Sequence, residues 1–135
     1  MEAQSLGGVG EITHADLPQM MARYRFFFHP VRYNSLGLAV CEAMLSGVPV
    51  VGLATTELVT VIENGVSGYL STDVDVLIAR MQQLIADPTL AQRLGQAAQQ
   101  QGRRRFSLNR FIADWNQALS LALQLPALPQ PSCAS

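Results

Sequence analysis

Three short runs rich in β-branched and aromatic residues alternate along this chain with longer segments of helical periodicity. We predict strands at residues 25–30, 48–53 and 68–71. Helices are expected around them, over residues 16–24, 33–45, 58–63, 74–87, 88–105 and 107–125. This alternation indicates an α/β fold with a Rossmann-like parallel sheet and flanking helices. Three strands are few for such a sheet, so we expect half of a larger sheet, with apolar surface exposed where further strands would pair.

Within the predicted helix at 33–45, the run at 38–45 is apolar nearly all the way round and carries one carboxylate, Glu42. Such a helix is buried on most sides, and a buried charge is costly unless it is paired or hydrogen-bonded. The stop signal Ser46-Gly47 follows, and then the strand at 48–53, which is typical of a buried parallel strand. A helix N-terminus, one inward acid and a core strand together indicate a phosphate-and-ribose site in an α/β sheet.

The other helices have recognisable start and stop signals. Asp16 is the expected N-cap of the first helix, Asn64-Gly65 ends the short third helix, and residues 72–75 form a capping box in outline. Ser107 caps the last helix, in which Phe111 and Trp115 are expected to be core residues. The first helix is expected to bury four apolar side chains: Leu17, Met20, Met21 and Tyr24.

Composition narrows the classes of function. The chain has 135 residues, 49% of them hydrophobic, and a net charge of −1, which fits one domain and gives no electrostatic basis for binding nucleic acid or an anionic membrane. The longest apolar run is far shorter than the ~20 residues that span a bilayer. We do not expect Met1-Glu2-Ala3-Gln4 to belong to a signal sequence, because no basic region precedes an apolar stretch. Cys41 and Cys133 lie in such different settings that we expect no disulfide and a reducing, cytoplasmic location.

Five runs of residues fall in register, without gaps, between positions 34 and 70. They are Ser35-Leu36-Gly37-Leu38, Glu42-Ala43-Met44, Gly47-Val48-Pro49-Val50-Val51, Asn64-Gly65 and Gly68-Tyr69-Leu70. In this order and spacing they resemble the retaining GT-B glycosyltransferases of family 4, the glycosyl transferases group 1 type. The resemblance covers about the first 115 residues. It implies that residues 1–125 are the later part of a GT-B donor-binding domain, and that residues 126–135 form a disordered tail.

The resemblance implies roles for two sets of residues. Glu42 matches the glutamate that hydrogen-bonds the ribose of a nucleotide-sugar donor; the alternative is a glutamate on the solvent side of the helix. The backbone N–H groups of Ser35, Leu36, Gly37 and Leu38 would bind the donor diphosphate at the helix N-terminus. The alternative, which is compatible with this role, is that Asn34 or Ser35 simply caps the helix.

Two departures from the family pattern concern catalysis. Asn34 stands where the family has the first of two glutamates, which contacts the donor sugar and supports charge redistribution at the anomeric carbon. The family's Gly-Gly and Pro-Glu pairs are replaced by Thr56-Glu57 and Val59-Thr60. Thr55 and Thr56 could donate hydrogen bonds near the phosphates, and Glu57 either replaces the missing acid or is a surface residue. Asn34 and Glu42 are thus the catalytic candidates.

The function implied is retaining transfer of a hexosyl group from a nucleotide-sugar to a saccharide or lipid-linked acceptor, in polysaccharide biosynthesis. No metal or other cofactor is expected, because the helix dipole and basic side chains would stabilise the diphosphate. The family also uses an Arg and a Lys from an earlier segment, whereas all nine basic residues here are Arg. We therefore expect a glycosyltransferase fragment, inactive alone, that needs a chain supplying the missing half. The alternatives are a non-catalytic remnant or interaction module that docks on another subunit and, less favoured, a GT-B-shaped sugar epimerase.

Overall fold

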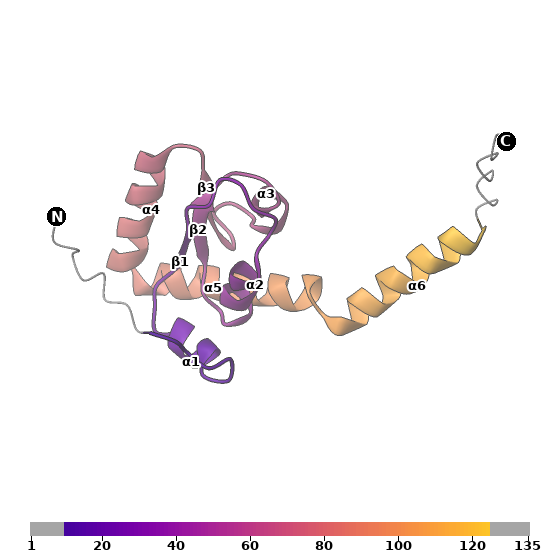
Figure 1. The fold of residues 1–135 in the computed structure, drawn as a ribbon. Helices are drawn as coiled ribbons and strands as arrows, with labels where there is room; N and C mark the ends of the chain where they lie inside the picture. The colour runs from indigo at the N-terminus through magenta and orange to yellow at the C-terminus, as the bar shows by residue number, and fades with distance from the viewer. Residues whose placement is uncertain (1–9, 125–135) are drawn as a thin grey trace.

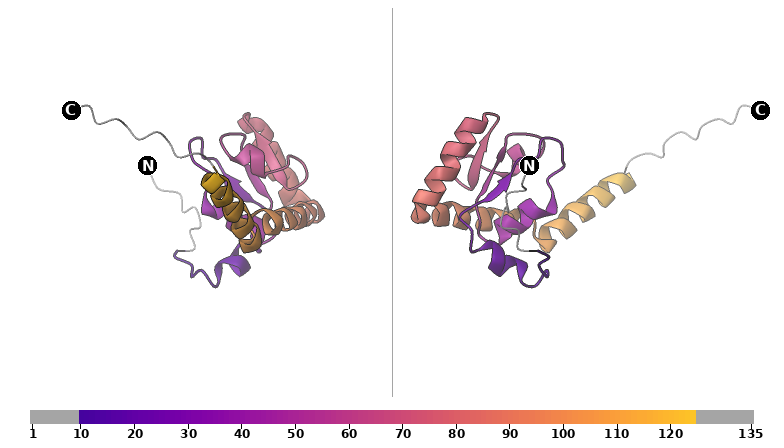
Figure 2. Two further views of the ribbon diagram at one scale, coloured as in Figure 1. Left: turned by 90° about the vertical axis from the view of Figure 1, so that its right-hand side faces the viewer. Right: turned by 60° about the vertical axis from the view of Figure 1, so that its left-hand side comes forward.

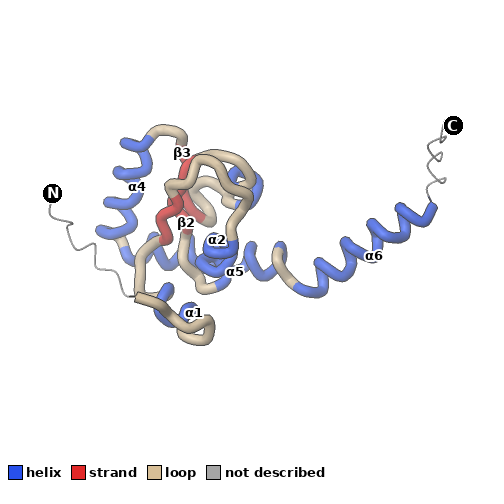
Figure 3. The backbone as a smooth tube through the Cα atoms, in the orientation of Figure 1, coloured by secondary structure: helices blue, strands red, loops and turns tan. Residues whose placement is uncertain are grey.

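The predicted strands form one parallel sheet, in the order β1-β2-β3 (Figures 1 and 3). The structure is a computed structural model and describes residues 10–124. The strands are β1 (Phe27–His29), β2 (Val50–Leu53) and β3 (Gly68–Ser71), each within the predicted range. Phe27 pairs with Val50, which in turn pairs with Gly68, so the three carboxyl ends lie at the same edge of the sheet. The α/β fold predicted from the sequence is confirmed.

Six helices surround this sheet in the described part of the chain. They are α1 (Leu17–Met21), α2 (Leu38–Leu45), α3 (Leu58–Val61), α4 (Val74–Ala86), α5 (Pro88–Arg105) and α6 (Leu108–Gln124). One core cluster joins α2 and α3 to one face of the sheet, and a second joins α4 to the other face. Helix α5 passes along the end of the sheet from which β2 starts and contributes to both clusters, as Figure 1 shows.

Strand β2 is buried along its whole length, as expected for a central parallel strand. Val50 belongs to the cluster beneath α2, whereas Val51 and Leu53 belong to the cluster beneath α4. Gly52 has no room for a side chain: a Cβ there would lie 2.8 Å from Leu58 Cδ2 and 2.9 Å from the carbonyl oxygen of His29. The strand is therefore held from both faces and both edges.

Helix α5 approaches the turn before β2 closely because it carries glycine at the contact. A Cβ on Gly95 would meet the carbonyl oxygen of Gly47 at 2.0 Å. Gln99 donates a hydrogen bond of 3.0 Å from Nε2 to the carbonyl of Leu45, one turn further along α5. Backbone contact and hydrogen bond together fix α5 against the end of α2.

The predicted burial of the last helix is wrong. Helix α6 forms and Ser107 caps it, its hydroxyl accepting a bond from the Arg110 N–H at 3.3 Å, but the helix has no buried residue. Phe111 is 59% exposed and Trp115 53%. The right view in Figure 2 shows α6 extending away from the sheet. The periodicity predicted the helix correctly, but no element among residues 10–124 lies where it could cover the apolar side.

Two helix ends also differ from expectation. Helix α1 ends at Met21, so Tyr24 is exposed, and Asp16 accepts a bond from the Thr13 hydroxyl instead of capping the helix with its side chain. Leu17, Met20 and Met21 are only partly buried. Helix α3 ends at Val61, before Asn64-Gly65. The Asn64 side chain instead bonds the Leu70 backbone, accepting from its N–H at 3.1 Å and donating to its carbonyl at 3.2 Å.

Apolar surface is exposed beside β1, as the expectation of a larger sheet implied. Phe28 is exposed, and the outer edge of β1 has no strand partner within the described residues. A hollow of about 260 Å³ lies there, lined by Met20, Met21, Tyr24, Phe26, Phe27, Phe28 and Val48. The predicted tail at 126–135 and Cys133 lie outside the described residues, so the boundary at residue 125 stays a prediction.

The contact between α5 and the 46–49 turn yields a stability prediction. Gly95→Ala should destabilise the fold by roughly 3 kcal/mol, because the new methyl group must displace backbone rather than a flexible side chain. Chemical denaturation would measure the change, with Gln96→Ala on the exposed side of the same helix as the control. Equal stability of the two variants would contradict the close approach of α5.

His29 yields a pH prediction. Its side chain is buried at the end of β1 and stacks on Phe27, with ring centroids 6.1 Å apart, and burial lowers the pKa of His29 from 6.5. Above pH 6.5 the ring is neutral in the folded and the unfolded chain alike. Between pH 6.5 and the lowered pKa of His29 the unfolded chain binds more protons than the folded chain. Stability should therefore fall below pH 6.5.

Urea denaturation at pH 7.5 and pH 5.0 would measure this effect. His29→Gln should reduce the difference between the two pH values, whereas His14→Gln, which removes the other histidine from an exposed position, should retain it. An unchanged difference in His29→Gln would show that other groups cause the acid sensitivity.

Candidate nucleotide-sugar site

A hollow lies at the carboxyl ends of the strands, where parallel α/β sheets commonly bind ligands. It has a volume of about 220 Å³. The residues that line it come from the loops after all three strands: Arg32, Tyr33, Leu53, Thr55 and Thr72. Of these residues, sequence reasoning singled out only Thr55 as a site residue.

A hydrogen bond between two of these loops shapes the hollow. The Thr55 hydroxyl, after β2, donates to the carbonyl oxygen of Val31, after β1, at 3.2 Å. The loop that contains Arg32 and Tyr33 is thereby tied to the loop that contains Thr55 and Thr56. Tyr33 itself is 92% exposed. This bond links the two loops that carry predicted site residues, of which only Thr55 lines the hollow.

Helix α2 starts at Leu38, and Gly37 is its N-cap. The φ angle of Gly37 is +75°, which favours glycine, and a Cβ there would lie 3.2 Å from the Asn34 side-chain nitrogen. No side chain caps this helix, so the alternative that Asn34 or Ser35 is the N-cap is wrong. The first-turn N–H groups of α2 have no capping side chain, and such a terminus favours an anion.

Glu42 is not the inward acid that the sequence suggested. The buried residues of α2 are Val40, Ala43 and Met44, and in a helix with 3.6 residues per turn Glu42 lies on nearly the opposite face. Its side chain is 31% exposed. Leu38, expected in a buried helix, is 80% exposed. The helix is therefore covered on one side, and its other face presents Glu42 at the surface.

The segment before α1 reaches this carboxylate. His14 Nδ1 lies 3.8 Å from Glu42 Oε1, and the His14 ring is almost fully exposed. Burial raises the pKa of the neighbouring Cys41 thiol, and the negative charge of Glu42 raises it further. Sequence reasoning assigned no role to His14, since nothing in the pattern linked a loop histidine to a helix 28 positions later.

The loop after β2 contains a strained threonine. Thr56 has a φ angle of +48°, the one positive value for a residue other than glycine within residues 10–124. The family resemblance places glycine at this position, so the backbone conformation is consistent with it although the residue is different. Strained backbone of this kind is concentrated at functional sites. Thr56 borders the loop whose Thr55 lines the hollow.

Glu57 takes part in a chain of hydrogen bonds. Thr60 donates from its hydroxyl to Glu57 Oε1 at 2.9 Å, and Arg105 donates to the Thr60 carbonyl at 2.8 Å. These bonds connect α3 to the end of α5. The idea that Glu57 replaces the missing acid stays a prediction.

The acidic pair at the end of β3 has a structural role. Asp73 and Asp75 have Asp-x-Asp spacing, but Asp73 is the N-cap of α4 and accepts from the Asp75 N–H at 2.9 Å. Among residues 10–124 there is no group of three or more His, Cys, Asp or Glu side chains placed to hold a metal ion. No helix in that range is long and apolar enough to cross a membrane.

The chain is similar in sequence to known glycosyltransferases. Residues 5–101 match the family described as "Glycosyl transferases group 1". A curated relative, the O-antigen chain mannosyltransferase B of Escherichia coli, is 37% identical over 81 residues, which are 58% of this chain and 21% of the relative. The chain thus spans about a fifth of the length of that relative.

Solved structures show the same arrangement of elements. Sucrose-phosphate synthase from Thermosynechococcus elongatus superposes with a TM-score of 0.75 at 26% identity, over 85% of this chain and 29% of the synthase. HepE from Anabaena, solved in complex with UDP, gives a TM-score of 0.71 at 28% identity, over 79% of this chain and 30% of HepE. HepE has also been solved with UDP-glucose. The sheet and its helices therefore correspond to part of the C-terminal domain of a GT-B enzyme, and the chain belongs to the glycosyl transferases group 1 family.

Proposed function

We propose that this chain binds the nucleotide-sugar donor in a glycosyltransferase that transfers a hexosyl group with retention. The observation that carries the proposal is the start of α2: a helix N-terminus without a side-chain cap, with Gly37 at positive φ, at the carboxyl edge of the sheet. The complexes of HepE with UDP and UDP-glucose support it, because HepE resembles 79% of this chain.

The diphosphate is proposed to bind at the loop and first turn formed by Ser35, Leu36, Gly37 and Leu38. The first N–H groups of α2 donate to the phosphate oxygens, and the positive end of the helix dipole favours their charge. Gly37 has no side chain to block this approach. Thr55 and Thr56 are proposed to donate further hydrogen bonds from the neighbouring loop.

Glu42 is proposed to accept hydrogen bonds from the ribose hydroxyls. Its carboxylate is partly exposed on the outer face of α2, where a ligand can reach it, and His14 Nδ1 lies 3.8 Å from Glu42 Oε1. A carboxylate can accept from two vicinal hydroxyls at once. The surface position of Glu42, unexpected from the sequence, thus supports the ribose role better than a buried position would.

Asn34 is proposed to contact the donor sugar through its amide. A Cβ on Gly37 would lie 3.2 Å from the amide nitrogen of Asn34, so the Asn34 side chain lies beside the proposed diphosphate position. An amide can donate to or accept from a sugar hydroxyl but carries no charge. The proposal therefore assigns sugar binding to Asn34 and leaves stabilisation of positive charge at the anomeric carbon to other groups.

The remaining parts of the reaction stay predictions. The acceptor is proposed to be a saccharide or a lipid-linked saccharide, and a further protein segment or partner chain is proposed to supply the rest of the GT-B site. No metal ion is part of this proposal. The cytoplasmic location also stays a prediction.

The second candidate function is a non-catalytic interaction module. Asn34 favours it, as do the exposed aromatic side chains of α6 and the exposed edge of β1. The two candidates differ in whether the chain binds a nucleotide, which a titration decides.

Isothermal titration calorimetry of the chain with UDP and with GDP tests the proposal. Glu42→Gln should weaken binding by roughly 1–3 kcal/mol, as for loss of a charged hydrogen bond. Glu63→Gln, an exposed glutamate in the turn before β3, is the matched control and should bind as the wild type does. If Glu42→Gln binds with unchanged affinity, the ribose assignment is wrong. If neither nucleotide binds, the interaction module is the better description.

A further inference from the structure

We propose that Arg32 is a donor-binding residue that pairs with the diphosphate of the nucleotide-sugar, an inference that rests on the proposed function. Arg32 follows β1 by three residues and lines the hollow at the carboxyl ends of the strands. It thus supplies a positive charge from within the chain at the site proposed for the diphosphate. The sequence motif gave no reason to choose it, because position 32 lies between the motif residues.

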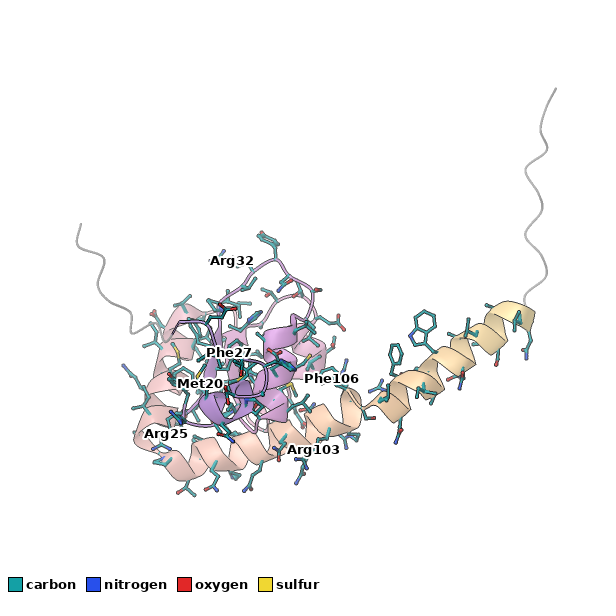
Figure 4. The ribbon with its side chains drawn as sticks, turned by 60° about the horizontal axis from the view of Figure 1, so that its bottom comes forward. Met20, Arg25, Phe27, Arg32, Arg103 and Phe106 are labelled. Atoms are coloured by element: carbon teal, nitrogen blue, oxygen red, sulfur yellow. The ribbon has the colours of Figure 1, made fainter. Side chains whose placement is uncertain are left out.

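The distribution of arginines singles out this position. All nine basic residues are Arg, and eight of them lie elsewhere: Arg23 and Arg25 before β1, Arg80 on α4, Arg93, Arg103, Arg104 and Arg105 on α5, and Arg110 on α6. Figure 4 shows Arg32 at the opposite end of the molecule from Arg25 and Arg103. Arg32 is therefore the one arginine of this chain in a loop that follows a strand.

The Arg32 guanidinium is also available. It makes no ion pair or hydrogen bond with the rest of residues 10–124, whereas Arg80 lies over the Tyr69 ring, Arg105 bonds Thr60 and Arg110 pairs with Asp114. A planar guanidinium with five N–H donors suits two phosphate oxygens at once. Nothing charged in the described chain must be displaced for Arg32 to bind a phosphate.

The surroundings of Arg32 suit a phosphate. Thr55 and Thr72 line the hollow together with Arg32, and no acidic residue is part of its lining. At about 220 Å³ it is smaller than the usual 300–1,000 Å³ of a whole small-molecule site, so it fits part of a donor rather than all of it.

Arg32 is also within reach of the proposed diphosphate position. Ser35 is three positions further along the chain, a span of at most about 11 Å even in extended backbone. The hydrogen bond from Thr55 to the Val31 carbonyl holds the backbone beside Arg32 at the edge of the sheet. The guanidinium and the N-terminus of α2 can therefore act on the same diphosphate from two sides.

The test compares Arg32→Gln with Arg23→Gln in the whole chain. Calorimetric titration with UDP should show a dissociation constant raised about 10- to 100-fold in Arg32→Gln, as for loss of a charged hydrogen bond. Arg23→Gln, which removes an exposed arginine at the other end of the sheet, should bind UDP as the wild type does. Arg32→Lys should recover part of the affinity, because it restores the charge but not the planar donor pair.

A second ligand separates phosphate pairing from a structural role. Uridine, titrated by NMR, should bind the wild type and Arg32→Gln equally, because it has no phosphate. Equal weakening of UDP and uridine in Arg32→Gln would overturn the inference, as would unchanged UDP affinity. If UDP binding is lost in Glu42→Gln but unchanged in Arg32→Gln, only the inference fails. If the wild type does not bind UDP, the proposed function and the inference both fail.

Discussion

The burial of β2 on both faces is the constraint on which the rest of the structure depends. Its four residues are all buried, with side chains alternating between the cluster under α2 and the cluster under α4. Gly52 allows β1 and α3 to approach closer than any side chain would permit. Because the neighbouring strands pair in parallel, their carboxyl ends must meet at one edge. The hollow with Arg32, Thr55 and Thr72 is a direct consequence of that geometry.

The same constraint positions α2, and through it the proposed donor site. One face of α2 is committed to the core by Val40, Ala43 and Met44, and α5 fixes its end through Gln99 and the contact at Gly95. The opposite face must then be the one that carries Glu42. Because packing fixes the rotation of α2 about its own axis, Glu42, the only acid of this helix, lies on an accessible side. The N-terminus of α2 lies at the edge of the sheet.

The fold was largely predictable from the sequence, because strands and helices here are set by local patterns. The three strands, the Ser46-Gly47 stop before β2 and the start of α4 at Asp73 all follow from β-branched runs and from the residues that begin and end helices.

The burial of individual side chains was less predictable, since it depends on which other element packs against them. Phe111 and Trp115 have the spacing of a core stripe, yet nothing in the described chain covers them. Glu42 was misplaced for the same reason: an apolar helix shows no contrast between its faces. His14 and Arg32 could not be linked to the site by spacing, because tertiary structure brings them there.

Asn34 stands two residues from Arg32 where the family pattern has a glutamate. This replacement affects donor affinity and the rate of sugar transfer differently in the proposed site. A glutamate at position 34 would add a negative charge two residues from Arg32, with which a phosphate would have to compete, whereas an amide adds none. The site proposed here therefore has one more unit of positive charge available to the donor than the family pattern would have. That charge stabilises the diphosphate of the bound donor, and it stabilises the diphosphate equally as it leaves during transfer. The positive charge that develops on the sugar, however, has no carboxylate at position 34 to stabilise it. Donor affinity and transfer rate are consequently expected to separate in this chain: binding depends on Arg32, α2 and Glu42, and the rate depends on a carboxylate that another segment must contribute.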